Sequence, residues 1–400
     1  MTAVILHVGL PKTGTSTIQF ALEDHQEALA RDGVLFPTGS HEKQRHAAFD
    51  LVGQRVEGQR APIAGAFRRM VEEINAFDGR AAVFSDEELG LARPRQVRRL
   101  AQAMQGHRVF VVVTVRDLAR TVVSAWQQGV VMGSTMTWRE FAAAVRDPAR
   151  GGVRTGAGFW ARQDLARVLD VWSAHVPAER IRIVTVPPSG SPPQVLLERF
   201  AAAANLPAEL LGDEGQTRNR ALGAAEVEVV RRLNVRVVGR IDNQLHHHVI
   251  ARGIRARWEA QDSRALVLPD EDFAWVLERS RSMIALVENR GHPVYGDLAD
   301  LVPRRQSSTS ARLDVVSSAE LLNATETALA ALTVAHGRLF RRFRRTLDTQ
   351  HTSTTKAEVF SSWARAHAFR VRKRLLARAD GNQLFAWAVR TYLRRTTGSR

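Results

Sequence analysis

The chain of 400 residues has no cysteine, no long apolar run and very little lysine. Without cysteine it can form no disulfide framework, no thiolate metal site and no thiol nucleophile, which suits a reducing cytoplasm. The chain has no run of about 18 apolar residues, the length that is needed to cross a membrane. The N-terminus enters a strand without a charged leader and an apolar signal segment. We therefore expect a cytoplasmic protein.

Lysine is scarce, because only four of the 57 basic residues are lysines and the rest are arginines. One of the four, Lys12, lies in the segment ILHVGLPKTGTSTIQ (5–19), where a short apolar strand leads into a Gly-rich turn and then a helix. A helix N-terminus offers unpaired N–H groups and the positive end of the helix dipole. Gly9 and Gly14 let the backbone approach an anion closely. The segment predicts a phosphate-binding loop.

The position of the lysine distinguishes this loop from that of nucleoside-triphosphate-binding proteins. Their motif reads G-x-x-x-x-G-K-[ST], with the lysine directly after the second glycine. Here Gly9 and Gly14 have the required spacing, but Thr15 takes the place of the lysine and Lys12 lies inside the loop. A compact ammonium there can follow one oxygen during group transfer, where a planar guanidinium would not fit.

A second anion-binding element follows the apolar run RVFVVVTV (108–115), which predicts a buried strand. Arg116 comes at the C-terminal end of this strand, and Asp117 can cap the helix that follows. Ser124 then lies two turns down that helix. The two elements together, in this order, are more specific than either alone.

These motifs resemble those of sulfotransferases that use 3′-phosphoadenosine-5′-phosphosulfate (PAPS). The string PKTGTS is similar to the family's 5′-phosphosulfate loop, and the Arg–Ser pair is similar to its 3′-phosphate element, although Leu118 stands where the family usually has proline. The resemblance implies in-line, metal-free transfer of a sulfuryl group from PAPS to a hydroxyl or amine. It also implies that the residues binding PAPS are Lys12, Thr13, Gly14, Thr15, Ser16, Thr17, Arg116 and Ser124.

The acceptor must lose a proton as it attacks sulfur, so the reaction needs a base. Glu87 is the first candidate, because it follows the strand predicted at Ala81–Ser85 and resembles the S-x-E of bacterial and glycan-modifying relatives. Some members of the family use histidine, and His46 is the histidine alternative. Acids at a helix N-terminus also favour the helix dipole, so a purely structural role for Glu87 stays open. Lys12 would stabilise charge on the leaving oxygen.

The sequence does not specify the acceptor, and a glycan, a glycolipid or a small metabolite would each fit. Trp126, Phe159 and Trp160 could stack on a sugar or lipid ring. His7, inside an apolar strand, is expected to be a core histidine with one hydrogen-bonded nitrogen.

Most of the net charge of +16 belongs to the C-terminal part of the chain. Residues 304–400 hold 19 basic and six acidic side chains, a net of +13, whereas residues 1–303 are nearly balanced. We predict a sulfotransferase domain at 1–303, a polar linker at 304–311 and a basic helical region at 312–400. Arginines among apolar residues in that region favour an anionic membrane surface, at the inner face of the membrane, or a protein partner. Packed or solvated helices are the alternative.

Strands and helices alternate along the main domain. Strands are predicted at 81–85, 108–115 and 181–186, and helices at 95–105, 160–175 and 193–204. The alternation predicts an α/β fold with a mainly parallel sheet, helices on both faces, and ligands at the carboxyl ends of the strands. With the resemblance, it implies a P-loop-like sulfotransferase fold with a basic helical appendage.

Two other classes of function stay open. A P-loop kinase-like phosphotransferase would use a similar loop, but it would need lysine at position 15 and a Mg²⁺ ligand, for which Asp86 is the one hint. A basic nucleic-acid-binding protein would fit the pI near 11.3. The main domain is nearly balanced in charge and carries no motif that reads bases, so nucleic acid is not an expected partner.

Overall fold

The computed structural model describes residues 1–53, 63–149, 155–212, 222–254, 258, 266–305, 311–312, 316–351 and 367. The chain forms two compact units, Met1–Leu332 and Thr333–Arg400. This division falls later along the chain than the linker expected at 304–311. Of that linker, Arg304 and Arg305 are irregular, Ala311 begins a short strand, and 306–310 lie outside the described residues.

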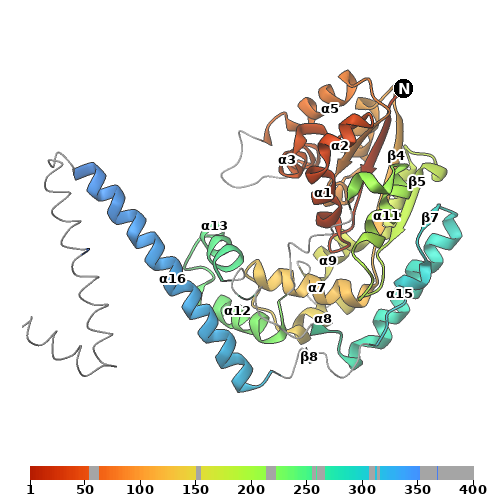
Figure 1. Ribbon diagram of the computed structural model, residues 1–400. Coiled ribbons are helices and arrows are strands. Elements are labelled where there is room, and N and C mark those ends of the chain that lie inside the picture. Colours follow the sequence, from red (N-terminus) through yellow and green to blue (C-terminus); the bar gives the residue numbers. More distant parts are fainter. Residues whose placement is uncertain are drawn as a thin grey trace, which may run out of the picture. The chain divides into compact units, whose positions relative to one another are not determined.

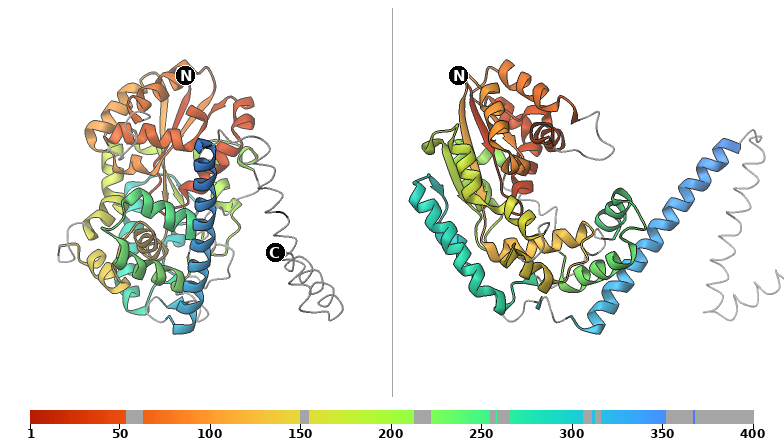
Figure 2. Two further views of the ribbon diagram at one scale, coloured as in Figure 1. Left: turned by 90° about the vertical axis from the view of Figure 1, so that its left-hand side faces the viewer. Right: turned by 180° about the vertical axis from the view of Figure 1, so that it is seen from behind.

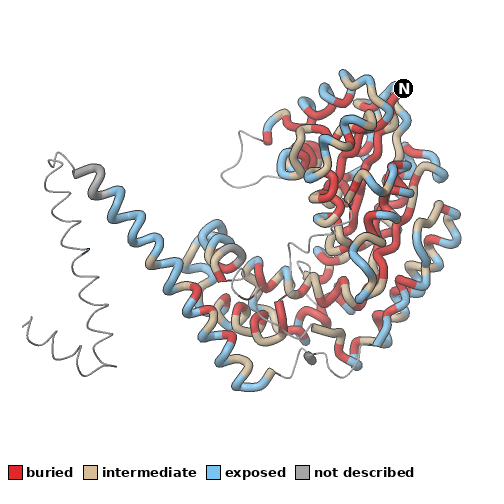
Figure 3. Tube along the Cα trace, in the orientation of Figure 1, coloured by how far each residue is buried: buried red, intermediate tan, exposed pale blue. Residues whose placement is uncertain are grey.

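Six parallel strands form the central sheet of the first unit, in the order β2-β3-β1-β4-β5-β7 (Figure 1). β3 is buried along its whole length and β4 over its last five residues. Figure 3 shows that buried residues gather in the region of the sheet. Parallel strands that are covered on both faces have nearly continuous apolar sequences, and the sequences of β3 and β4 are of this kind. The strands are β1 (Ala3–His7), β2 (Val34–Leu35), β3 (Ala81–Ser85), β4 (Arg108–Val115), β5 (Ile181–Thr185) and β7 (Val294–Tyr295).

Helices cover both faces of this sheet, which confirms the expected α/β class (Figure 2). Side chains alternate between the two layers along β1, where Val4 and Leu6 join one core cluster and Ile5 joins the other. The first face packs against α3 (His41–Val52), α5 (Ala66–Ala76), α6 (Pro94–Ala103) and α10 (Leu165–Ser173). The second packs against α1 (Thr15–Asp24) and α11 (Gln194–Ala204).

A third apolar cluster is built mainly from helices beyond the carboxyl ends of the strands. It includes α7 (Leu118–Val131), α8 (Trp138–Arg146), α9 (Gly156–Gln163), α12 (Ala224–Val237) and the N-terminal turns of α15 (Asp270–Arg290). The other elements are α2 (Gln26–Arg31), α13 (Asn243–His247), β6 (Leu266–Val267) paired with β8 (Ala311–Arg312), α16 (Ser318–His351), a π-helical turn at His248–Ile254, and 3-10 turns at Pro37–Gly39, Glu87–Leu91 (η2), Ala178–Arg180, Ala208–Leu211 and Leu298–Leu301 (η6).

Aromatic residues of the third cluster pack on one another. Successive rings from Trp126 through Trp138, Phe141 and Phe159 to Trp160 lie 5.1–6.3 Å apart. Trp126 and Phe159 are buried, and the indole N–H groups of Trp126 and Trp160 donate to backbone carbonyls. Trp126 and Phe159 are therefore core residues, and the stacking role expected for them is wrong.

The helices expected at 95–105 and 193–204 are confirmed as α6 and α11. The helix expected over 160–175 is instead two helices, α9 and α10. Asp164 separates them, because its side chain accepts a hydrogen bond from the backbone N–H of Arg167 and so caps α10.

Of the basic C-terminal region, the structure describes residues 312, 316–351 and 367, and α16 makes up most of this part. The N-terminal turns of α16 belong to the first unit, where Ala324 is buried and accepts a hydrogen bond from Trp258 Nε1 at 3.2 Å. Apart from His367, the part of the expected helical region beyond residue 351 lies outside the described residues. None of the helices that are described is long and apolar enough to span a membrane. A membrane or protein partner for this region stays a prediction.

The segment 291–303 closes one edge of the main sheet. β7 pairs with β5, and Asp300 is tied to the end of β5. The Asp300 carboxylate accepts hydrogen bonds from Thr185 Oγ1 at 3.0 Å and from an Arg199 guanidinium N–H at 2.6 Å. The side chains of Arg199 and Asp300 are only 20% and 9% exposed, so this ion pair is largely removed from water.

Asp300→Ala should lower the free energy of unfolding by about 3–5 kcal/mol, because it leaves the Arg199 charge unpaired in a buried site. Asp297→Ala is the matched control: the exposed Asp297 caps η6 through a bond from the N–H of Ala299, and its loss should cost about 1 kcal/mol. Urea unfolding of both variants gives the comparison. Equal, small losses would show that the Asp300 pair does not anchor this segment.

Candidate functional site

The loop between β1 and α1 presents a row of unpaired N–H groups. Lys12 and Gly14 both have positive φ, 71° and 84°, and alternating backbone handedness of this kind makes a concave nest of N–H groups. Helix α1 begins at Thr15, so its first N–H groups have no partner within the helix. Within the described residues, no acceptor bonds the backbone N–H groups of 13–16. Such unpaired N–H groups are the donors that the predicted phosphate-binding loop would need.

The carbonyl groups of the same loop are bound by side chains from three parts of the fold. Leu10 O accepts from Thr13 Oγ1 at 2.5 Å, Pro11 O from Gln163 Nε2 at 2.7 Å, and Lys12 O from Arg116 Nη1 at 3.1 Å. The donors come from the loop itself, from α9 and from the end of β4. Because these three consecutive carbonyl oxygens face their donors, their partial negative charges are directed to hydrogen bonds within the protein.

Two buried polar atoms beside the loop have no hydrogen-bond partner among the described residues: Thr15 Oγ1 and Arg116 Nε. Leaving such a donor unpaired costs about 1–3 kcal/mol, so both atoms suit a ligand that accepts hydrogen bonds. Burial lowers the pKa of Arg116 to about 10, with a further lowering from Arg120, and the guanidinium still carries its charge at neutral pH. Gly9 is required here, because a Cβ would lie 2.2 Å from Thr15 Oγ1.

Arg116 and Ser124 occupy the predicted places, at the end of β4 and on α7. Asp117 caps α7 as expected, because its Oδ1 accepts from the N–H of Arg120 at 2.9 Å. Ser124 is half-buried and follows Arg120 by four residues, so the two share one side of α7. A shared anion for Arg116 and Ser124 stays a prediction.

Glu87 begins η2 at the carboxyl end of β3, the strand beside β1. Burial raises its pKa and Glu88 raises it further, while the positive charges of Arg45, Lys12 and Arg162 act in the opposite direction. Those three cations come from α3, from the loop and from α9. The structure therefore brings Glu87 into the electrostatic neighbourhood of Lys12.

The backbone that leads to Glu87 is fixed by three side chains. The N–H of Ser85 donates to Gln44 Oε1 at 2.8 Å, and its carbonyl accepts from Gln19 Nε2 at 2.7 Å. The hydroxyl of Ser85 lies 2.7 Å from Nδ1 of His7. Every polar group of Ser85 is thus bound just before the candidate base.

His46 lies on α3, two residues after Gln44. Two residues along an α-helix are separated by about 200°, so His46 faces away from the side on which Gln44 meets Ser85. The geometry favours Glu87 over His46, and the assignment of the base stays a prediction.

Asp86 is a buried carboxyl group beside the candidate base. Its Oδ1 accepts from the N–H of Glu88 at 2.9 Å, and its Oδ2 has no hydrogen-bond partner in the described part of the chain. The nearest cation is Arg45, whose Nε is 3.8 Å from Oδ2. Burial raises the pKa of Asp86 to about 7. Among the described residues, no three histidine or carboxylate side chains are grouped to hold a metal ion.

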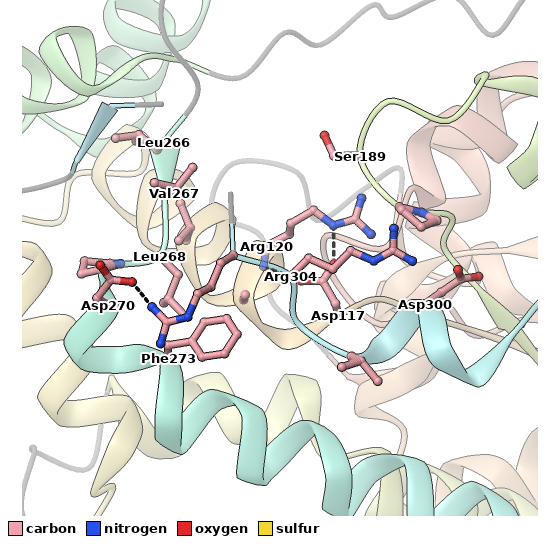
Figure 4. A pocket seen from close by; sticks show the side chains of 16 residues that line it. Asp117, Arg120, Ser189, Leu266, Val267, Leu268, Asp270, Phe273, Asp300 and Arg304 are labelled. Carbon is pink, nitrogen blue, oxygen red and sulfur yellow. Dashed lines mark hydrogen bonds and ion pairs between the residues drawn. The ribbon is translucent and has the colours of Figure 1, made fainter. Parts of the chain in front are cut away.

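Asp117, which follows Arg116 in the sequence, lines a cavity of about 600 Å³. Figure 4 shows Arg120, Arg304 and Asp300 toward one end of it, and Leu266, Leu268 and Phe273 toward the other. The described residues that line it include neither Lys12 nor Ser124. The cavity is therefore separate from the candidate anion-binding residues, although Asp117 in its wall directly follows Arg116 in the sequence.

No family model and no curated protein matches the chain. One similar solved structure is the crystal structure of a sulfotransferase from Alicyclobacillus acidocaldarius, with 13% sequence identity and a TM-score of 0.36. The match covers 64% of this chain and 98% of that one. At this identity and TM-score the similarity says nothing about the site or the reaction.

Sequence reasoning missed the side chains that hold the site in place. Thr114 could have been noticed as His7 was, because a polar residue inside an apolar strand is buried and needs partners. Gln44 and Gln19 lie on helices with no distinctive pattern around them. Gln163 is more than 150 positions from the carbonyl that it binds, and no local signal links the two.

The buried carboxyl of Asp86 predicts a pH-dependent stability. Its pKa is about 7 in the folded protein against 3.8 for an exposed aspartate, so between those values the folded state binds more protons than the unfolded state. The contribution of Asp86 to the free energy of unfolding is therefore complete below about pH 3.8. It is lost as the pH rises to about 7, and the free energy of unfolding falls by up to about 1.4 kcal/mol per pH unit. Asp86→Asn should flatten this part of the profile, and the exposed control Asp78→Asn should not. Parallel profiles for the wild type and Asp86→Asn would contradict the assignment.

Proposed function

We propose that the chain is a sulfotransferase that moves the sulfuryl group of PAPS to a hydroxyl or amine. The observation that carries this proposal is the loop itself, where the N–H groups of 13–16 are unpaired within the described residues and Lys12 lies within the turn. Thr15 stands where a nucleoside-triphosphate loop has its lysine. A loop of this form suits a phosphosulfate group.

The described residues fit the nucleotide at both of its charged ends. The N–H groups at the start of α1, the Lys12 ammonium and the Thr15 hydroxyl would bind the 5′-phosphosulfate. Arg116 and Ser124 would bind the 3′-phosphate, and the unpartnered Arg116 Nε and Thr15 Oγ1 supply donors that the protein leaves unused.

The chemistry follows from these positions. The acceptor oxygen or nitrogen forms a bond to sulfur while the bond from sulfur to the bridging phosphate oxygen breaks. Negative charge develops on that oxygen, where Lys12 and the N–H groups of the loop stabilise it. The acceptor proton passes to Glu87, whose carboxylate lies among cations at the adjacent strand end. The acceptor belongs to a class still to be identified: glycan, glycolipid or small metabolite.

Lys12→Ala and Arg116→Ala should have different effects. Loss of the Lys12 ammonium should lower the rate of PAP (3′-phosphoadenosine-5′-phosphate) release from PAPS, measured with a panel of acceptors, by roughly 10²–10³-fold. Arg116→Ala should chiefly weaken the binding of PAP. Lys43→Ala, which removes an exposed lysine of α3, is the control for both. If both site variants changed only the affinity, Lys12 would be a binding residue and its role in transfer would be wrong.

Glu87→Gln preserves the shape of the side chain and removes its basic charge. Sulfuryl transfer should fall by about 10²–10⁴-fold while PAP binding persists. The base acts when ionised and its pKa is raised, so the wild-type rate should increase with pH through that pKa and the variant should lose this step. Glu42→Gln, on the exposed side of α3, is the control. Normal turnover in Glu87→Gln with a loss in His46→Ala would move the role to His46.

A further inference from the structure

His7 is fully buried at the C-terminal end of β1, and both of its ring nitrogens are hydrogen-bonded. Nδ1 lies 2.7 Å from Ser85 Oγ in β3, and Nε2 lies 3.2 Å from Thr114 Oγ1 in β4. The ring packs against Phe200 of α11, with ring centroids 5.0 Å apart. The expectation of one bonded nitrogen is therefore wrong, and His7 connects three adjacent strands.

The hydrogen bonds continue from β4 into the phosphate-binding loop. Thr114 Oγ1 lies 2.7 Å from Thr13 Oγ1, and Thr13 donates its hydroxyl proton to Leu10 O at 2.5 Å. A carbonyl oxygen can only accept, so Leu10 O is a fixed end for this chain of bonds. The five residues Ser85, His7, Thr114, Thr13 and Leu10 form one buried row.

The direction of every bond in the row follows from that fixed end. Each hydroxyl has one proton, so Thr13, which donates to Leu10 O, must accept from Thr114. Thr114 has then used its own proton and must accept from Nε2 of His7. Nδ1 of His7 is left without a proton and accepts from the hydroxyl of Ser85. One neutral tautomer, with its proton on Nε2, satisfies all four bonds.

We infer that His7 is a positioning residue of the proposed sulfotransferase site, fixed as the Nε2–H tautomer, and that it sets the phosphate-binding loop relative to the strand that carries the base. The effect on sulfuryl transfer rests on the proposed function. The tautomer and the effect on anion binding do not.

Three members of the row are close in sequence to the candidate site residues, so the row can position the site as well as fill the core. Ser85 precedes Glu87 by two residues, Thr114 precedes Arg116 by two, and Thr13 follows Lys12 directly. The loop also lies close over the row, because a Cβ on Gly9 would be 2.9 Å from Thr114 Oγ1 and 3.2 Å from His7 Nε2. Burial lowers the pKa of His7 to about 3, so the imidazole ring is uncharged at neutral pH.

Thr114→Val and Thr114→Ser in the full chain test the inference. Valine has the shape of threonine without the hydroxyl, so His7 Nε2–H loses its acceptor and Thr13 loses its donor. The affinity for PAP, and for inorganic sulfate as a probe of the loop alone, should fall by about tenfold or more in Thr114→Val. In Thr114→Ser, which restores the hydroxyl, it should stay within about threefold. Thr2→Val is the control, because it removes another buried hydroxyl, bonded to Gly79 O at the opposite end of β1.

The side-chain ¹⁵N NMR spectrum of His7, assigned by comparison with His7→Gln, gives a readout that core packing alone would not move. We expect a protonated Nε2 and an unprotonated Nδ1, unchanged between about pH 8 and about pH 5. An Nδ1–H tautomer or an imidazolium would overturn the inference. So would equal affinities in Thr114→Val and Thr2→Val at equal losses of stability. If Thr114→Val does not fold, the spectrum of the wild type still decides.

The failure of the proposed function would look different. A wild type that binds sulfate but not PAP would remove the nucleotide assignment, and a sulfate affinity that depends on the Thr114 hydroxyl would still support the role of His7. A wild type that binds neither would overturn both.

Discussion

The candidate site depends on the orientation of the backbone carbonyl and N–H groups of residues 10–16. Three successive carbonyls, from Leu10 to Lys12, are bound by side chains of Thr13, Gln163 and Arg116, and the following N–H groups are left unpaired. The left-handed conformation of Lys12 costs roughly 1–2 kcal/mol for a residue with a side chain, and these bonds offset that cost. If the proposed function holds, the loop has the conformation that binds the anion before any anion binds.

The carboxyl ends of β3, β1 and β4 bring charged and polar side chains together in a partly buried environment. Within the described residues, Lys12, Arg116 and Glu87 come from three different strand ends, and burial shifts the pKa of Arg116 downward and that of Glu87 upward. Both shifts reflect the loss of water, which strengthens every remaining electrostatic interaction. The sheet thus brings Lys12, Arg116 and Glu87 to neighbouring strand ends, as the proposed function requires.

The parts of the site that the sequence predicts are those with local signals. The spacing of Gly9 and Gly14, the place of Lys12, and the run of apolar residues before Arg116 each lie within one strand–turn–helix unit, where dihedral preference and periodicity are informative. Contacts that join distant elements have no such signal, which is why Gln163 and the row through His7 were missed. Periodicity also cannot tell a core aromatic from a binding one, so Trp126 and Phe159 were misassigned. The helix break at Asp164 depends on one capping bond.

Calorimetric titration of the full chain with PAP and with ATP, each with Mg²⁺ and with a chelator, tests the central claim most directly. A loop with its lysine inside the turn and Thr15 in the P-loop lysine position should bind PAP without Mg²⁺ and more tightly than ATP under either condition. ATP binding that is equal or tighter and requires Mg²⁺ would contradict the account and favour a phosphotransferase.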